Sequence, residues 1–156
     1  MNSAHAHLLL NHLPVLGSAF GVLLLLFAFA RKSDEIKRVA LGVFVFAALT
    51  AVPVYLTGEP AEDIVERLPG IYKPMIEEHE EAAEGAAAAL GVLGVMSLAG
   101  LVGFRRSASV PHWLSVSSLV LGLVVAALMA RTAGLGGRIH HPEVRSQNGI
   151  TKEGSD

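Results

Sequence analysis

Residues 7–30 read HLLLNHLPVLGSAFGVLLLLFAFA, and this stretch decides the fold of the chain. It contains no Asp, Glu, Lys or Arg. It is also long enough to cross a bilayer, because a hydrocarbon core of about 30 Å takes about 20 helical residues. Three further apolar stretches follow it. The sequence therefore predicts membrane-spanning helices at about 8–30, 39–57, 83–104 and 112–133.

Four spans of this kind predict an all-α integral membrane protein with an antiparallel four-helix bundle. Half of the twelve Lys and Arg residues lie in two short connections, which hold Arg31, Lys32, Lys37, Arg38, Arg105 and Arg106. The positive-inside rule places these connections in the cytoplasm. Both termini are then expected on the outer, periplasmic side of the inner membrane. We expect one domain over 1–146, followed by a polar C-terminal tail over 147–156.

Two features outside the spans carry further predictions. Pro60 suits the first turn of a helix, and apolar residues recur at helical spacing after it. We therefore expect a short amphipathic helix over about 60–68 that lies on the membrane surface. After the fourth span, Gly134, Gly136 and Gly137 are expected to end the helix.

Composition narrows the possible chemistry. The chain has no cysteine, which excludes disulfides, thiolate-bound zinc, iron–sulfur clusters and thioether-linked haem. The formal net charge is -2, so nothing indicates a nucleic-acid partner. No nucleotide-binding loop, nucleophile elbow or metalloprotease motif is present. The seven histidines are therefore the main candidate ligands for a metal ion or a haem iron.

Six of the seven histidines are predicted to gather at the outer face of the membrane. Counting helix rise from the cytoplasmic ends places His12 and Arg131 roughly 27 Å up, and His7 and His79 roughly 35–38 Å up. Several residues that follow the second and fourth spans reach a comparable level: Glu59, Glu62, Arg138, His140 and His141. Polar groups at the edge of a span need partners, so we expect a shared outer site.

Helical periodicity predicts the direction of some of these side chains. On the third helix, apolar and small residues at steps of three and four share a face with His79, which is therefore expected to point inward. The opposite face carries three glutamates that are expected to face water, Glu77, Glu81 and Glu84. On the first helix, His5 and His12 share a face and His7 lies well round from both. The choice between His7 and His12 as a ligand stays open.

Two histidines on facing helices can hold a b-type haem at its two axial positions without a covalent link. The predicted axial pair is His79 with either His7 or His12. Arg131 or Arg138 would pair with the haem propionates. Such a protein would pass electrons between a membrane quinol pool and a periplasmic carrier. It would do so as a subunit of a larger respiratory or electron-transfer assembly, beside other membrane or cytochrome subunits, rather than as a stand-alone enzyme.

Two alternatives remain. Histidines and carboxylates can bind Cu, Zn or Fe directly, and the candidate ligands for such a site are His7, His12, Glu59, Glu62, His79 and His141. The chain could instead be a structural membrane subunit without a cofactor, in which case each histidine is an ordinary interface or hydrogen-bonded residue. The small residues of the third helix leave room for a flat cofactor, which favours haem.

Three segments resemble a group of uncharacterised bacterial four-span membrane proteins. They are residues 5–14 (HAHLLLNHLP), residues 55–62 (YLTGEPAE) with the later His79-Glu80, and residues 136–143 (GGRIHHPE). The chain is more distantly similar to a membrane family of unknown function with a histidine-rich first helix, whose members occur joined to, or beside, cytochrome-like modules. The resemblance covers nearly all of the chain. It implies the four-span fold, a shared outer site with His141 rather than His140 at the conserved tail position, and a redox or haem link by association.

Overall fold

A computed structural model describes residues 2–67 and 73–140. These residues form the helices α1 (Ser3–Leu10), α2 (His12–Arg31), α3 (Asp34–Val65), α4 (Lys73–Gly103) and α5 (His112–His140). A turn at Asn11 separates α1 from α2, and the two together make the first of four helical segments that are long and apolar enough to cross a membrane. The prediction of an all-α four-helix bundle is confirmed. The chain is a multi-pass membrane protein.

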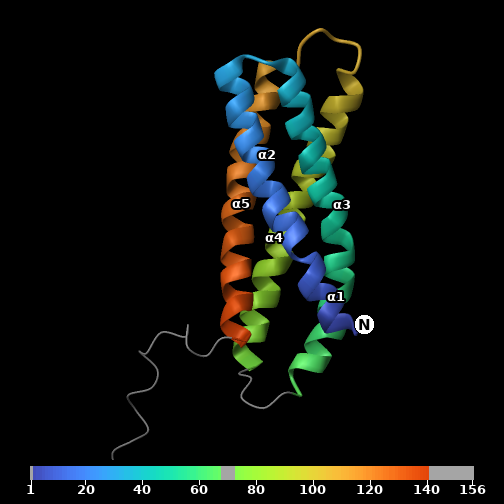
Figure 1. The fold of residues 1–156 in the computed structure, drawn as a ribbon, viewed down its shortest axis with the longest axis vertical. Helices are drawn as coiled ribbons and strands as arrows, with labels where there is room; N and C mark the ends of the chain where they lie inside the picture. The colour runs from blue at the N-terminus through green and yellow to red at the C-terminus, as the bar shows by residue number, and fades with distance from the viewer. Residues whose placement is uncertain (1, 68–72, 141–156) are drawn as a thin grey trace, which may run out of the picture.

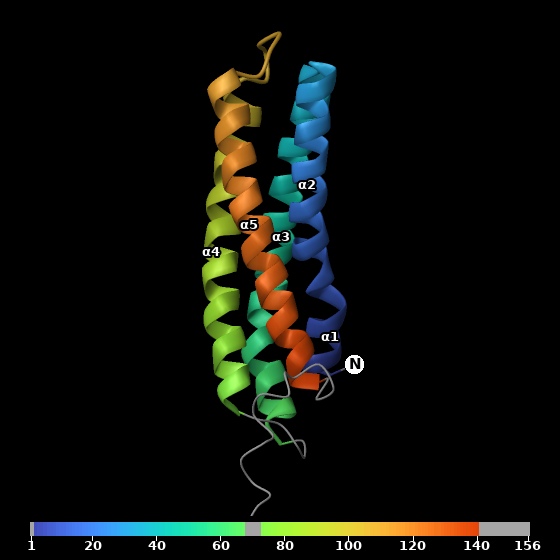
Figure 2. The same ribbon diagram turned by 90° about the vertical axis from the view of Figure 1, so that its left-hand side faces the viewer.

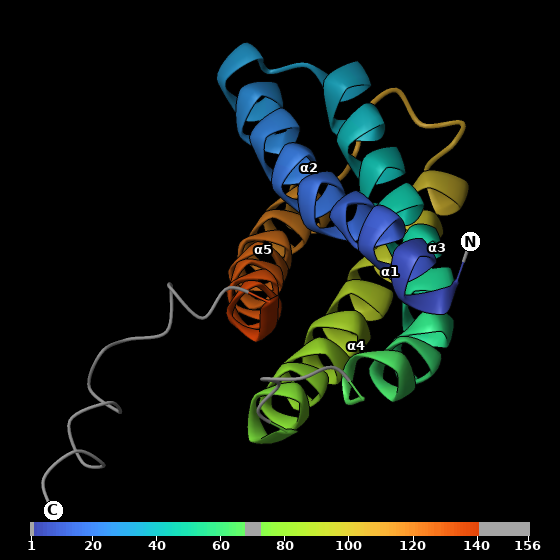
Figure 3. The same ribbon diagram turned by 60° about the horizontal axis from the view of Figure 1, so that its bottom comes forward.

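The long helices lie side by side along the axis of the bundle (Figures 1 and 2). α2 packs against α3 and α5, and α4 also packs against α3 and α5, which closes the bundle into a ring. α1, which precedes Asn11, departs from this pattern because it packs mainly on α3 (Figure 3). We name the end with residues 31–38 and 104–111 the charged-loop end. The end with His7 and His79 is the histidine end.

The core combines small residues with a few large apolar side chains. Fully buried examples are Leu25 of α2, Phe44 of α3 and Leu90 of α4. Many other large apolar side chains point outward, such as Leu56 at 68% exposure and Val95 at 70%. An apolar outer surface of this extent suits contact with lipid.

Glycine permits the closest contacts between helices. A Cβ on Gly94 of α4 would collide with the Cβ of Ala48 on α3, and a Cβ on Gly21 of α2 would collide with the ring of Phe44 on α3. Close approach at small residues is how helices gain packing contacts in lipid. The position of α3 between α2 and α4 therefore depends on both glycines.

α3 extends further than the sequence predicts. Residues 60–65, expected as a separate helix on the membrane surface, instead continue α3 beyond Pro53 and Pro60. Each proline removes one backbone hydrogen bond. The inward face of α3 nevertheless continues through both, with Val54 half-buried and Ala61 only 7% exposed. Packing of this face against neighbouring helices keeps the helix intact.

α5 also continues past its predicted end. The glycines over 134–137 do not end the helix, which reaches His140, so that prediction is wrong. Each glycine lowers helix stability by about 1 kcal/mol relative to alanine. Leu135 and Ile139 are nevertheless buried, at 6% and 8% exposure. Their packing into the bundle outweighs the low helix propensity of the glycines.

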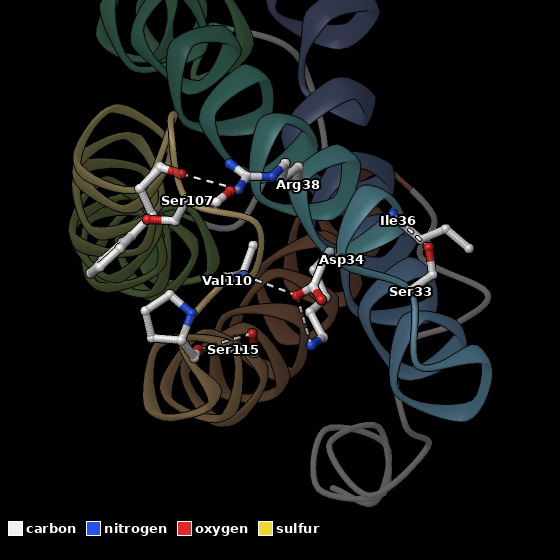
Figure 4. Close-up of polar contacts among 10 residues, drawn as sticks. Ser33, Asp34, Ile36, Arg38, Ser107, Val110 and Ser115 are labelled. Carbon is white, nitrogen blue, oxygen red and sulfur yellow. Dashed lines mark hydrogen bonds and ion pairs between the residues drawn. The ribbon is translucent and has the colours of Figure 1, made fainter.

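Hydrogen bonds from α3 hold the connection between α4 and α5 at the charged-loop end (Figure 4). Asp34 Oδ1 accepts the Val110 backbone N–H at 2.9 Å. The Arg38 guanidinium donates to the carbonyl oxygens of Phe104 at 3.0 Å and Ser107 at 2.8 Å. Carbonyls at the end of a helix have no partner within the helix. Two residues at the start of α3 therefore satisfy and position this connection.

Replacing Gly94 with alanine is expected to force α3 and α4 apart, because the new Cβ would collide with Ala48. Overpacking of this kind destabilises by about 1–3 kcal/mol, which is measurable as a lower midpoint of thermal unfolding in detergent. Gly91→Ala is the matched control, since a Cβ there meets nothing within 4 Å. Equal midpoints for Gly94→Ala and the wild type would contradict the expectation.

Asp34→Ala is expected to loosen the connection from α4 to α5, because it leaves the Val110 N–H without its acceptor. The expected loss is about 1–3 kcal/mol. Trypsin should then cleave after Arg105 or Arg106 faster than in the wild type. Glu35→Ala, a change at the exposed neighbouring carboxylate, serves as control. Unchanged cleavage in Asp34→Ala would show that this hydrogen bond does not hold the connection.

Candidate functional site

The histidine end brings together two imidazoles from different helices. His7 of α1 points to α3, and His79 of α4 points to α5, as its predicted inward direction required. Both side chains are half-buried, and His79 lies within electrostatic range of His7. His5 and His12 are exposed, and His12 Nδ1 bonds only within its own helical segment, to the carbonyl of Leu8 at 3.0 Å. Of the two candidates on the first helical segment, His7 is therefore the one that is half-buried and within electrostatic range of His79.

The ring of His7 is held by the backbone of α3. Its Nδ1 lies 3.1 Å from the carbonyl oxygen of Val54 and 3.4 Å from Thr57 Oγ1. A carbonyl only accepts, so Nδ1 carries the proton and donates it. The Thr57 hydroxyl donates its proton to the carbonyl of Pro53 at 2.8 Å or to that of Val54 at 3.0 Å. Thr57 Oγ1 can therefore also accept a hydrogen bond from His7 Nδ1–H. In the neutral ring, Nε2 then keeps its lone pair.

The ring of His79 is held in the same way by α5. Its Nδ1 lies 3.0 Å from the carbonyl oxygen of Thr132, so Nδ1 donates and Nε2 again keeps its lone pair. The imidazole lies directly against the helix backbone, because a Cβ on Gly136 would be 3.0 Å from His79 Cε1. His79 thus joins α4 to α5 at a point where α5 offers no side chain.

A glycine stands four residues after the accepting carbonyl in both cases. Gly58 follows Val54, and Gly136 follows Thr132. Helix side chains lean back over the preceding turn, so a larger residue at either glycine would cover the carbonyl one turn earlier. A carbonyl oxygen has two lone pairs, one for the helix N–H and one for a second donor. The glycines leave that second lone pair accessible to an imidazole.

The result is a pair of oriented imidazoles with available nitrogen atoms. Histidines that bind metals usually donate the other ring N–H to a carbonyl or carboxylate, which fixes the tautomer and the ring orientation. His7 and His79 both have this arrangement. In the described parts of the chain, 2–67 and 73–140, neither Nε2 forms a hydrogen bond. Both can therefore act as ligands.

The carboxylates predicted to join a metal site are placed less favourably for binding a metal ion than the two imidazoles. Glu59 is exposed. Glu62 is half-buried and lies within electrostatic range of Glu80 on α4. Among the residues that the structure describes, no three His, Asp or Glu side chains come close enough to hold a metal ion. His141, the remaining predicted ligand, lies outside those residues, so a direct metal site stays a prediction.

Arg131 and Arg138 lie on another face of α5. They border a cavity of about 390 Å³ between α4 and α5. Its lining residues are Glu78, Ala130, Arg131, Gly134, Leu135 and Arg138. Thr132 and Gly136, which contact the α4 imidazole, lie roughly a third of a turn round the helix from this face. The predicted pairing of the arginines with haem propionates stays a prediction.

The partners of the imidazoles escape sequence reasoning, although one signal was present. The acceptor in each bond is a backbone carbonyl. Every residue type has one, so the sequence does not show which carbonyl accepts a bond from another helix. His79 and Gly136 do lie at the same height above the charged-loop end. The number of residues from His79 to Gly103, at the end of α4, equals the number from His112, at the start of α5, to Gly136. A comparison of heights along the helices matches His79 with Gly136, whereas the glycine by itself indicates only a helix end.

Gly136→Val is expected to displace the His79 imidazole, because the added carbon atoms would occupy the position of its Cε1. Imidazole ¹⁵N chemical shifts should then show loss of the fixed Nδ1–H form of His79. Gly137→Val is the matched control, since a Cβ there meets nothing within 4 Å. An unchanged His79 spectrum in Gly136→Val would show that the ring is not held against α5.

Comparisons with protein-family models, curated proteins and solved structures found no match to this chain. The resemblance to four-span membrane proteins with a histidine-rich first helix therefore stays a prediction.

Proposed function

We propose that this chain is a membrane electron-transfer protein that binds a b-type haem between His7 and His79. One observation carries the proposal: two imidazoles from different helices each have Nδ1 bonded to a backbone carbonyl and Nε2 available. Haem iron takes its equatorial ligands from the porphyrin and needs only two axial ligands from the protein. A bis-histidine pair supplies both.

The number of ligands favours haem over a directly bound metal ion. Zinc and copper sites in proteins generally use three or four convergent side chains. The described residues bring together two imidazoles and no third His, Asp or Glu ligand. Each imidazole also lies beside a glycine of the neighbouring helix, Gly58 or Gly136. Because α1 packs mainly on α3 and makes at most slight contact with α5, little helix packing needs to break on that side to admit a flat cofactor.

Haem, when bound, supplies one-electron redox chemistry. The chain's own contribution is to orient the two ligands. The carbonyls of Val54 and Thr132 hold each Nδ1–H, which fixes the neutral tautomer and makes Nε2 a better donor to a metal. Buried apolar side chains at the histidine end keep the surroundings of the two imidazoles apolar. They are Ala61, Ile76 and Leu135.

The direction in the membrane follows from the basic residues of the charged-loop end. The positive-inside rule places that end in the cytoplasm and the histidine end, with the N-terminus, on the periplasmic side of a bacterial inner membrane. A site at that level is accessible to quinol at the membrane edge and to a periplasmic electron carrier. The chain would then work within a larger assembly, beside cytochrome or other membrane subunits.

The proposal is tested by the cofactor content of the full chain, expressed in haem-sufficient cells and purified in detergent. Reduced-minus-oxidised spectra are expected to show a low-spin b-type haem, at one haem per chain. Elemental analysis of the same sample reports iron, copper and zinc. Stoichiometric copper or zinc without haem bands would support the direct metal site instead. Absence of both haem and metal would leave the structural-subunit hypothesis.

Three variants test the ligand pair. His7→Ala and His79→Ala are each expected to lower haem content about tenfold or more, because each removes one axial ligand. His12→Ala is the matched control, since its exposed ring bonds only to Leu8 in its own helical segment. Full haem content in His7→Ala together with loss in His12→Ala would overturn the pairing.

A further inference from the structure

The cavity lined by Arg131 and Arg138 is separate from the histidine pair and faces away from the interior of the bundle. It lies between α4 and α5 and has a volume of about 390 Å³. Gly134 lies between the two arginines along α5, and a Cβ there would meet nothing within 4 Å. The middle of this site is therefore open to a ligand rather than filled by a side chain.

Among the residues that the structure describes, the charged residues of the cavity lining are the two arginines and Glu78 of α4. Glu78 Oε1 lies 3.8 Å from Arg131 Nη2, and the two side chains are 55% and 61% exposed. A pair that long and that exposed contributes little. Each guanidinium has five N–H donors in a planar fork that matches the oxygens of a phosphate group.

The position of the cavity along α5 matches the headgroup layer of a bilayer. Trp113, 63% exposed at the start of α5, suits one membrane–water interface. From Trp113, Arg131 lies roughly 27 Å and Arg138 roughly 38 Å along the helix. The hydrocarbon core is about 30 Å thick. The two arginines therefore bracket the level at which the opposite leaflet carries its phosphates.

Exposed apolar side chains continue from the cavity toward the middle of the membrane. Val124 lies two turns before Arg131 on the same face of α5 and is 49% exposed. Val92 of α4, further toward the charged-loop end than Glu78, is 61% exposed. A free phosphate ion would use only the arginines. A phospholipid would use the arginines for its phosphate and this apolar surface for its acyl chains.

We propose that the cavity lined by Arg131, Gly134 and Arg138 binds the phosphate headgroup of an anionic phospholipid. The carboxylate of Glu78 limits the affinity, because it offsets part of the positive charge. The lipid would cover the outer contact between α4 and α5, roughly a third of a turn round α5 from the face on which Thr132 and Gly136 hold the imidazole. This site does not depend on the haem proposal, since Arg131, Gly134 and Arg138 lie on another face of α5 than Thr132 and Gly136, which contact the imidazole.

The test is lipid binding to the full chain in detergent, by native mass spectrometry with phosphatidylglycerol, phosphatidylcholine and inorganic phosphate as probes. Phosphatidylglycerol is expected to bind more tightly than phosphatidylcholine by about fivefold for each participating arginine. Millimolar inorganic phosphate is expected not to displace it. Equal binding of the two lipids, or displacement by inorganic phosphate, would overturn the proposal.

Variants assign the effect to the cavity. Arg131→Gln and Arg138→Gln are each expected to lower the preference for phosphatidylglycerol about fivefold, and Glu78→Gln is expected to raise it. Arg67→Gln, at an exposed arginine of the same end of the bundle, is the control and should change nothing. Thermal unfolding in detergent confirms that each variant is folded. Arginine variants that keep the lipid preference but lose haem absorbance would show that these residues serve the cofactor, and the proposal would fail.

Discussion

Contact between helix backbones is the constraint on which the rest of this structure depends. Within a membrane, apolar side chains gain nothing by leaving lipid for protein, so helices are held by close packing instead. Gly94 provides that contact where α4 meets Ala48 of α3. α3 then links both ends of the molecule. Its first turn positions the connection from α4 to α5 through Asp34, and its last turns accept His7 at the carbonyl of Val54.

The histidine end uses the same feature of glycine for a different purpose. In the core, missing side chains let helices touch. At Gly58 and Gly136 they uncover a backbone carbonyl, so that an imidazole from another helix can bond to it. In each bond Nδ1 donates, so Nε2 of the same imidazole keeps its lone pair. The ring lies beside helix backbone at a glycine, Gly58 or Gly136, where there is no side chain. A pair of such nitrogen atoms in an apolar setting is suited to haem iron and is poorly suited to a metal ion that needs three or four protein ligands.

The last turns of α5 serve two surfaces. Thr132 and Gly136 face the bundle and hold His79, whereas Arg131 and Arg138 line the cavity on the outside. The run of glycines in this segment weakens the helix, and burial of neighbouring apolar residues compensates. A phospholipid seated on the outer surface would stabilise the part of α5 that the imidazole contacts inside. Lipid and cofactor would then support the same helix end on two different faces.

The sequence by itself determined the fold class, because the length and apolarity of each span are local properties that a bilayer requires of any helix crossing it. It also determined that His79 points inward, since helical periodicity relates residues on the same helix. Only the tertiary structure decided that His7, and not His12, is half-buried and within electrostatic range of His79. That choice depends on the turn at Asn11 and on the packing of α1 against α3, and periodicity within one helix does not specify how that helix is rotated against its neighbours. The same reason explains why the carbonyl partners of the imidazoles, and the continuation of α3 and α5 past prolines and glycines, became visible only in the packed bundle.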